Sequence, residues 1–523
     1  MQTTAGRRRK RGTRERLRRE RLEGLAPAVP PIGPGLVGGT YRPFTDGDLR
    51  RLHEASLHIL EHFGVSEPID AWRERVVEAG GWMTERGRLC FPPALVEDTI
   101  AGAARSFTLP GRDPKHDMLL SGSRTYYATS TAAIRMLDLE TGEYRHTTLR
   151  DLYDMVRMAD ALDNVHFVQR PLIARDLVDD EALDINTAYA TTAATAKPII
   201  TTFFKSESLE KAIALYDLSV GGDGDGTRFR RRPFASTTCT VVVSPLRFSP
   251  ESLRVADTAV RNGVPLKVST VSQAGATGPV SLAGNIALGN AEVLAGYVAL
   301  NLLRPGCRLL YGNWPFVSDL RTGAFVGGGG EMALQMSGSA QLARFYDLPS
   351  TVAAAMTSAK VSDAQSGWEK GYLSTLPALA GANMIMMTMG GLADNVGYSP
   401  EALVIDESML SGVLRSVRGI EVDDRTLAME SIERAIHGDG HFLGDGLTLE
   451  MMQSEFVYPK LADRQSIDAW LESGSPDIRN RAREIAREIL ARHYPTHIDA
   501  ADDARIRARF SIVLPPEAMR PAG

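Results

Sequence analysis

Short apolar segments rich in β-formers recur eight times along residues 166–409, and most of the stretches between them have helical periodicity. Strands that alternate with helices at a spacing of about 30–40 residues pair in parallel, because a parallel crossover needs room for a helix. Eight such units close a barrel, whose chemistry lies in the loops at the C-terminal ends of the strands. The eight predicted strands are His166–Ala174, Pro198–Phe204, Phe234–Val243, Pro265–Val271, Cys307–Asn313, Ser350–Met356, Asn383–Gly390 and Ala402–Met409.

The chain as a whole is predicted to be an α/β protein, a (β/α)8 TIM barrel with an N-terminal α+β extension and C-terminal helices. Residues 1–39 combine a basic tail with a Pro/Gly linker that we expect to be disordered. Residues 40–165 form the N-terminal extension, in which Phe107–Tyr144 alternates as a small antiparallel sheet would. The barrel takes residues 166–409, and residues 410–523 form a C-terminal helical segment.

Composition limits the class of protein. Hydrophobic residues make up 43% of the chain and charged residues 24%, which is the balance of a soluble globular protein. No run approaches the roughly 18 apolar residues of a membrane span, so we expect no membrane segment. Cys90, Cys239 and Cys307 lie far apart, and neither a disulfide framework nor a zinc knuckle follows from them. The cytoplasm, which is reducing, is the expected location.

Charge is unevenly distributed along the chain. Residues 1–25 carry ten Lys/Arg and three Asp/Glu, whereas the remainder carries 49 Lys/Arg against 61 Asp/Glu. Because the main body is acidic, nucleic acid is not expected as its ligand. The run Arg7–Arg11 either binds an anionic surface or is a solvated tail. No apolar segment follows this run, so a secretory signal is not expected.

The most distinctive motif is Val271-Ser-Gln-Ala-Gly-Ala-Thr-Gly-Pro-Val-Ser-Leu-Ala-Gly-Asn285, which leaves the fourth strand and enters a helix. Gly275 and Gly278 permit unusual backbone angles, and Pro279 is preset for a first helical turn. Small side chains at this place let a ligand approach the backbone, although an ordinary strand-to-helix turn uses the same residues. Three further runs are Ser318–Gly323 with Gly327–Glu331 after the fifth strand, Ser362–Lys370 after the sixth, and Gly440–Gly444 beyond the barrel.

Together these motifs resemble the trimethylamine methyltransferase family, whose members are also called MttB-like. The resemblance covers about residues 40–510, and its most specific parts are Gln-Ala-Gly-Ala-Thr-Gly-Pro from Gln273 and Asp-Ala-Gln-Ser-Gly-Trp-Glu-Lys from Asp363. The family implies a TIM barrel that moves a methyl group from an amine to the cobalt of a separate corrinoid protein. Its archetype carries pyrrolysine, which this chain lacks, so the resemblance is to members without pyrrolysine. Some of those members use quaternary amines such as glycine betaine.

A quaternary ammonium substrate makes sense of the missing pyrrolysine. Its nitrogen already carries a positive charge and its leaving group is a neutral amine, so no acid has to protonate the nitrogen. The protein then has to supply position, a dry pocket and stabilisation of the cation, for which aromatic faces contribute about 0.5–2 kcal/mol each. The expected substrate-binding residues are Tyr127, Phe204, Gln273, Trp314, Phe316, Arg321 and Trp368. The expected catalytic residues are Glu331, Gln365 and Asp406.

Each of these residues also has a structural explanation. The aromatic side chains can serve packing alone, and Arg321 can form a surface ion pair with Asp319 or Glu331. Glu331 can be a plain charge at a helix N-terminus. Asp406 and Glu407 can be an exposed pair in a loop.

The resemblance also implies a cofactor and partners. The cofactor is cobalamin carried by a corrinoid partner protein, with none tightly bound to this chain and no metal site on it. The substrate is a small methylated amine, and the enzyme is expected to be a homo-oligomer. The run Asp439–Gly444 matches the Asp-x-His-x-x-Gly pattern of corrinoid-binding domains, but only helical sequence follows it, so we expect a family loop there. Whether His441 contacts a ligand stays open, because Asp445 stands where many relatives have histidine.

Two other functions are open alternatives. The chain can be a degenerate scaffold that binds the corrinoid protein without catalysis. It can also be another TIM-barrel lyase or decarboxylase that acts on an anionic substrate, which would require a basic pocket at the strand ends.

Overall fold

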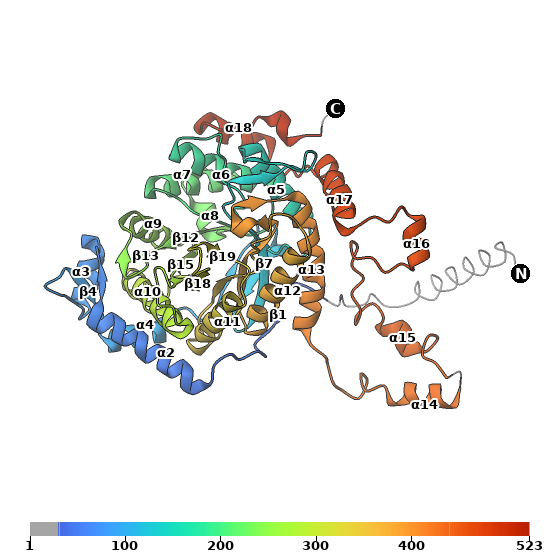
Figure 1. Ribbon diagram of the computed structural model, residues 1–523. Helices are drawn as coiled ribbons and strands as arrows, with labels where there is room; N and C mark the ends of the chain where they lie inside the picture. Colours follow the sequence, from blue (N-terminus) through green and yellow to red (C-terminus); the bar gives the residue numbers. More distant parts are fainter. Residues whose placement is uncertain (1–29, 31, 439, 522–523) are drawn as a thin grey trace, which may run out of the picture.

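Eight parallel strands lie at the centre of the protein, and helices surround them (Figure 1). The computed structural model describes residues 30, 32–438 and 440–521. The basic run Arg7–Arg11 and Asp439 lie outside the described residues. Within the predicted linker, strand β1 (Leu36–Val37) pairs antiparallel with β7 (Arg124–Thr129), so these two residues are part of the fold rather than of a disordered linker.

The central strands are hydrogen-bonded to parallel neighbours. One sheet has the order β10-β11-β12-β15-β17, and a second contains β7-β21-β20. Two isolated parallel bridges, Ala128 with Phe167 and Tyr311 with Ser350, join the edges of these sheets, so each central strand has a parallel neighbour on both sides. The strands after β7 are β10 (Val168–Gln169), β11 (Ile199–Thr201), β12 (Ala235–Thr240), β15 (Leu266–Thr270), β17 (Leu309–Asn313), β20 (Thr351–Ala353) and β21 (Met384–Met389).

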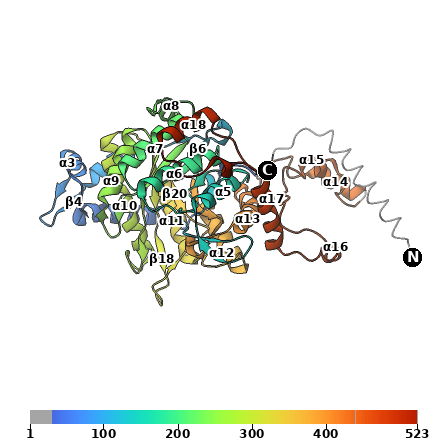
Figure 2. The same cartoon turned by 90° about the horizontal axis from the view of Figure 1, so that it is seen from above.

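Helices alternate with these strands along the chain, which makes the protein an α/β structure. The order is β7-α5-β10-α6-β11-α7-β12-α9-β15-α10-β17-α11-β20-α12-β21-α13, with a short α8 (Thr227–Arg231) between α7 and β12 (Figures 1 and 2). The eight alternating helices are α5 (Leu149–Asp160), α6 (Asp180–Ala194), α7 (Ser206–Leu218), α9 (Pro250–Arg261), α10 (Leu282–Leu303), α11 (Gly330–Phe345), α12 (Ala364–Leu379) and α13 (Pro400–Arg418).

Seven of the eight predicted strands are confirmed in position, and the eighth is wrong. Residues Ala402–Met409 lie inside helix α13, and the eighth parallel strand is β7, which the sequence placed in an antiparallel sheet of the extension. The helix begins here because Ser399 caps it, accepting a hydrogen bond from the N–H of Ala402, and Pro400 occupies its first turn. A short apolar run fits a buried strand and a buried helix equally well, so periodicity alone could not separate them.

The N-terminal part packs beside the loop that follows β12. Strands β13 (Val242–Val243) and β14 (Arg247–Phe248) from that loop join β2, β4 and β3 in one sheet. The N-terminal elements are α2 (Asp46–His58), the π-helical turn η1 (Ile59–Phe63), β2 (Val65–Ser66), α3 (Asp70–Glu78), β3 (Trp82–Met83), β4 (Arg88–Cys90), α4 (Pro93–Gly102), β5 (Phe107–Leu109), η2 (Pro114–His116), β6 (Met118–Leu120), β8 (Arg135–Leu137) and β9 (Tyr144–His146).

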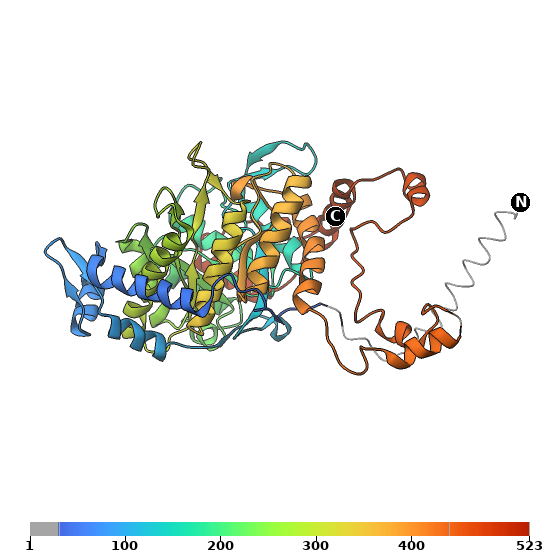
Figure 3. The same ribbon diagram turned by 60° about the horizontal axis from the view of Figure 1, so that its bottom comes forward.

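The C-terminal part first leaves the body of the protein and then returns to it (Figure 3). Helices α14 (Met429–His437), α15 (Gly446–Met451) and α16 (Ile467–Glu472) project outward, whereas α17 (Ile478–Arg492) packs on α13. Two ion pairs hold this contact, because Glu401 on α13 accepts hydrogen bonds from Arg479 at 2.7 Å and Arg483 at 3.1 Å on α17. Helix α18 (Ala500–Arg509) and the turn η4 (Pro516–Met519) complete the described chain.

Helix α10 is the most apolar helix beside the strands. By length and composition it could cross a membrane, but 89% of its apolar window is buried inside the protein. Gly296 lies where α10 meets the strands: a Cβ atom there would be 2.7 Å from a methyl group of Val268 and 2.8 Å from one of Val241. The absence of a side chain at Gly296 therefore allows the close approach of α10 to β15.

We expect Gly296→Leu to lower the free energy of unfolding by about 1–3 kcal/mol, because the added methylenes overpack this contact. Urea unfolding followed by circular dichroism measures the change. Gly412→Leu on α13 is the matched control, since a Cβ atom there meets nothing within 4 Å. A Gly296→Leu protein as stable as the control variant would show that the contact tolerates extra volume.

Candidate functional site

Short strands after β15 and β17 bring three of the predicted site residues together. Strand β16 (Gln273–Ala274) pairs with β18 (Phe316–Ser318), with Gln273 opposite Phe316. The ring of Phe316 lies 6.3 Å from that of Trp314 and 5.0 Å from that of Phe325 on β19 (Phe325–Val326). Trp314 is buried, and its Nε1 donates to the carbonyl oxygen of Thr351 at 3.1 Å.

The glycines of the distinctive motif are needed for packing. Gly275 has a φ of 82°, and a Cβ atom there would lie 2.4 Å from Leu320 on the neighbouring hairpin. A Cβ atom on Gly278 would lie 2.0 Å from the side-chain oxygen of Asn285. Helix α10 begins at Leu282, so Pro279 precedes the helix instead of occupying its first turn.

A buried lysine faces the aromatic group. The ammonium nitrogen of Lys267, on β15, lies 3.1 Å from the centre of the Trp314 ring, and Lys267 is only 2% exposed. Among the described residues it has no hydrogen bond and no ion pair, so the ring face is the group in contact with its ammonium nitrogen. Burial lowers the pKa of the Lys267 ammonium well below its usual value of 10.5.

A buried arginine lies directly after β10. Arg170 is 6% exposed, and its Nε and Nη1 atoms have no hydrogen-bond partner in the described part of the chain. Burial lowers the pKa of its guanidinium, while the carboxylate of Asp184 opposes this shift. Neither Arg170 nor Lys267 is among the site residues predicted from the sequence. The available signal was a single cationic side chain inside a predicted strand that has no other charged residue, as in Pro265–Val271.

Polar loops meet at the first turns of α12. One carboxylate oxygen of Glu369 accepts hydrogen bonds from the Thr357 hydroxyl at 2.5 Å and the N–H of Ser358 at 2.9 Å, and the other accepts from Gln365 at 3.0 Å. A Cβ atom on Gly328 would lie 2.2 Å from the Glu369 carboxyl carbon, so glycine is required there. Gln365, predicted as catalytic, is therefore held by Glu369 among the loops that follow β17 and β20.

Asp406 is not at the end of a strand, as the sequence predicted, because its segment is helical. It is buried in α13, accepts a hydrogen bond from Lys370 on α12 at 2.5 Å, and also accepts from the N–H of Gly390 at 2.8 Å. These bonds tie α12 and α13 to the end of β21. Asp406 therefore has a structural role, and its part in catalysis stays a prediction.

The other five predicted residues have varied surroundings. Arg321 pairs with Asp319 on the β18–β19 hairpin, and its side chain is 89% exposed, as the surface-pair alternative requires. Trp368 and Glu331 are exposed in the first turns of α12 and α11. Tyr127 is buried and donates to the Ser374 carbonyl oxygen at 3.0 Å. Phe204 is partly exposed after β11, and its N–H donates to Asp184 at 3.0 Å.

We expect Asp406→Ala to lower the free energy of unfolding by about 3–5 kcal/mol, because it leaves the charge of Lys370 buried without its partner. Chemical denaturation measures this loss. Arg321→Ala serves as the control and should leave stability unchanged, since its ion pair is exposed. If the Asp406→Ala protein were as stable as wild type, this ion pair would not stabilise the fold.

We expect Lys267→Met to raise the free energy of unfolding at pH 7, because methionine has no charge to bury. The pKa of Lys267 is lower in the folded protein than in the unfolded chain, so at a pH between these two values the unfolded chain binds more protons. The wild-type protein therefore loses most stability to this lysine at low pH. The advantage of the variant should therefore shrink as pH rises toward 10.5. Urea unfolding at pH 7 and pH 10 compares the two proteins. Lys211→Met, at an exposed position, should show no such pH dependence, and an equal response of both variants would contradict the expectation.

Comparison with known proteins identifies the family. A family model described as "Trimethylamine methyltransferase (MTTB)" matches residues 7–511. The trimethylamine methyltransferase MttB of Methanosarcina barkeri (strain Fusaro / DSM 804) is 32% identical over 469 residues, which cover 89% of this chain and 94% of that protein. The MttB of Desulfitobacterium hafniense (strain DSM 10664 / DCB-2) is 30% identical over 478 residues, covering 91% of this chain and 94% of that protein.

A further relative and one solved structure complete the comparison. The glycine betaine methyltransferase of Desulfitobacterium hafniense (strain Y51) is 28% identical over 468 residues, which cover 90% of this chain and 96% of that protein. The crystal structure of the Methanosarcina barkeri monomethylamine methyltransferase (MtmB) aligns with a TM-score of 0.48 and 12% identity, covering 86% of this chain and 87% of that one. The chain belongs to the trimethylamine methyltransferase family and is an enzyme with methyltransferase activity.

Proposed function

We propose that this protein moves a methyl group from a small quaternary amine that carries a carboxylate, such as glycine betaine, to the cobalt of a separate corrinoid protein. Family membership supports the methyl transfer, and one relative is named glycine betaine methyltransferase. The corrinoid acceptor rests on the family resemblance. We also propose that the eight alternating strands and helices form a (β/α)8 barrel, supported by the parallel neighbours on both sides of every central strand.

The buried lysine at the aromatic group supports the choice of substrate. A simple alkylammonium at Trp314 would be repelled by the ammonium group of Lys267, because like charges in a buried site interact strongly. A betaine differs because its carboxylate can accept hydrogen bonds from Lys267, which has no carboxylate partner among the described residues. Its ammonium end would then lie against the aromatic group of Trp314, Phe316 and Phe325.

The residues of this chain bind and orient the amine and exclude water from it. The corrinoid supplies the nucleophile that takes up the methyl group when its carrier is docked. A docking surface is supported at the carboxyl ends of the strands, because the loops or first helical turns after seven of the eight central strands expose large apolar side chains. These side chains are Val178, Phe204, Val243, Val271, Val280, Leu320, Trp368 and Val396.

We expect the purified protein, mixed with a reduced corrinoid protein, to form methylcobalamin from glycine betaine at least about tenfold faster than from choline. Choline lacks the carboxylate, and one charge-assisted hydrogen bond contributes about 1.5–3 kcal/mol. Absorbance follows the reaction, with trimethylamine and tetramethylammonium included in the panel.

Lys267→Gln should abolish most of this preference, whereas Arg321→Ala, which changes an exposed residue, should keep it. Equal rates with choline and glycine betaine would reject the carboxylate contact. Absence of methylation with every amine would reject the proposed reaction.

Lys267 and Arg170 also favour a second candidate, lyase or decarboxylase chemistry on an anionic substrate, because they supply the basic groups that this alternative requires. This candidate predicts consumption of a carboxylate substrate without the corrinoid protein. Carbon dioxide release measured without the corrinoid protein separates it from methyl transfer.

A further inference from the structure

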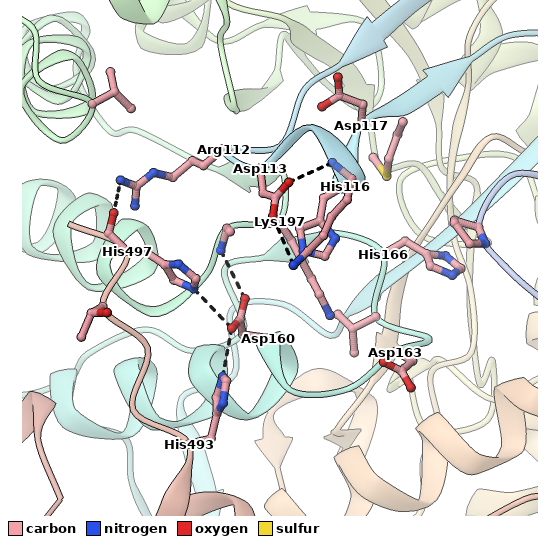
Figure 4. Close-up of a pocket in the computed structure, with 17 residues that line it drawn as sticks. Arg112, Asp113, His116, Asp117, Asp160, Asp163, His166, Lys197, His493 and His497 are labelled. Atoms are coloured by element: carbon pink, nitrogen blue, oxygen red, sulfur yellow. Dashed lines mark hydrogen bonds and ion pairs between the residues drawn. The ribbon is translucent and has the colours of Figure 1, made fainter. Parts of the chain in front are cut away.

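A polar cavity lies at the opposite ends of the strands from the candidate site. Its volume is about 670 Å³, and its walls come from the loop before β6, the loop between α5 and β10, the residues before β11 and the segment after α17 (Figure 4). Two of these wall segments lead directly into β10 and β11, so the cavity is at the amino ends of the parallel strands. None of the residues proposed for methyl transfer lines it.

The deepest carboxylate of the cavity is already fully paired. Asp160 accepts hydrogen bonds from the Thr195 hydroxyl at 2.7 Å and the Ala196 N–H at 3.2 Å. Its other oxygen accepts from Nε2 of His493 at 2.9 Å and from Nε2 of His497 at 3.3 Å (Figure 4). Although burial raises the pKa of Asp160, these hydrogen bonds outweigh that effect and hold it well below its usual value.

The acids of the loop before β6 also have partners. Asp113 accepts from the N–H of Lys115 at 3.0 Å, and Asp117 accepts from the N–H of Gly111 at 3.0 Å and from Arg232 at 2.5 Å. The acidic side chains of the cavity, apart from Asp163 at its rim, therefore already have partners.

Two buried side chains in the cavity, by contrast, each have one N–H group without an acceptor among the described residues. Nδ1 of His166 accepts the Tyr127 N–H at 3.0 Å, so the ring proton is on Nε2, which is buried and has no partner in the described part of the chain. His166 is 6% exposed, and burial lowers its pKa to about 3, so it stays a neutral donor. Lys197 is 3% exposed and donates to the carbonyl oxygens of Ala159 at 2.8 Å and Leu162 at 2.6 Å. Its third N–H has no partner among the described residues.

We propose that this cavity is a second ligand site and binds an oxyanion, a carboxylate or a phosphate group, through His166 and Lys197. An anion supplies the acceptor that both donors lack, and a buried donor without a partner is costly. The guanidinium of Arg112 adds positive charge at the wall of the cavity. It donates hydrogen bonds to the carbonyl oxygens of Thr192 and Ser219, both at 2.8 Å, and to that of His497. The site is independent of the proposed methyl transfer.

Isothermal titration calorimetry of the full chain, with inorganic phosphate and acetate as probes and chloride at equal ionic strength as reference, tests the proposal. We expect saturable binding of one equivalent of at least one probe, and the tighter probe identifies the anion class. Heats of titration that match those of chloride for both probes would overturn the proposal and indicate that the cavity binds no oxyanion.

Three variants assign the binding to these residues. His166→Asn keeps an acceptor for the Tyr127 N–H but removes the Nε2 donor, and it should weaken the anion at least tenfold. Asp163→Asn should tighten binding, because it removes a negative charge from the rim of the cavity, where Asp163 interacts electrostatically with Lys197. Asp163 is exposed, so the fold should tolerate this substitution. His58→Asn, at an exposed position on α2, should change nothing. Unchanged binding in His166→Asn, or weaker binding in Asp163→Asn, would overturn the proposal.

Discussion

Parallel pairing of the central strands is the constraint on which the other features depend. A parallel neighbour cannot be reached by a tight turn, so a helix must return the chain to the starting side after each strand. All eight strands therefore end on the same side, and their loops meet although they are far apart in sequence. The N–H of Gly327, after β17, donates to Asp394, after β21, at 2.8 Å. For the same reason Gln273, which follows β15, pairs with Phe316, which follows β17.

Burial inside this arrangement gives three cationic side chains different surroundings. Lys370 has a carboxylate partner in Asp406, so the pair links α12 and α13 and requires no ligand. Lys267 has only the face of an aromatic ring, and Arg170 has two nitrogens without partners among the described residues. An incompletely compensated buried charge costs several kcal/mol unless something else stabilises it. This difference is why Lys267, and not Lys370, supports the proposed contact with a substrate carboxylate.

The two ends of the strands have different chemistry. The carboxyl ends combine buried cations and aromatic rings with exposed apolar loops, which supports the proposal that a small amine and a docking protein bind there. The amino ends contain a polar cavity in which the deepest acid, Asp160, holds two histidines of the C-terminal segment. Asp160 therefore fastens the returning chain near residues 493–497 to the body of the protein, next to the unpaired donors His166 and Lys197.

The sequence by itself determined seven of the eight strands, most of the helices between them and the family, because apolar periodicity and local motifs are encoded in short stretches. The sequence also predicted Gln273, Trp314 and Phe316 as site residues, and the structure brings them together because they follow strands that pair in parallel. Only the tertiary structure decided that β7 is the eighth strand and that Asp406 lies in a helix, since a short apolar run fits either element. The surroundings of Lys267 and His166 were equally out of reach of the sequence, because their partners, or the lack of partners, come from strands and loops distant along the chain.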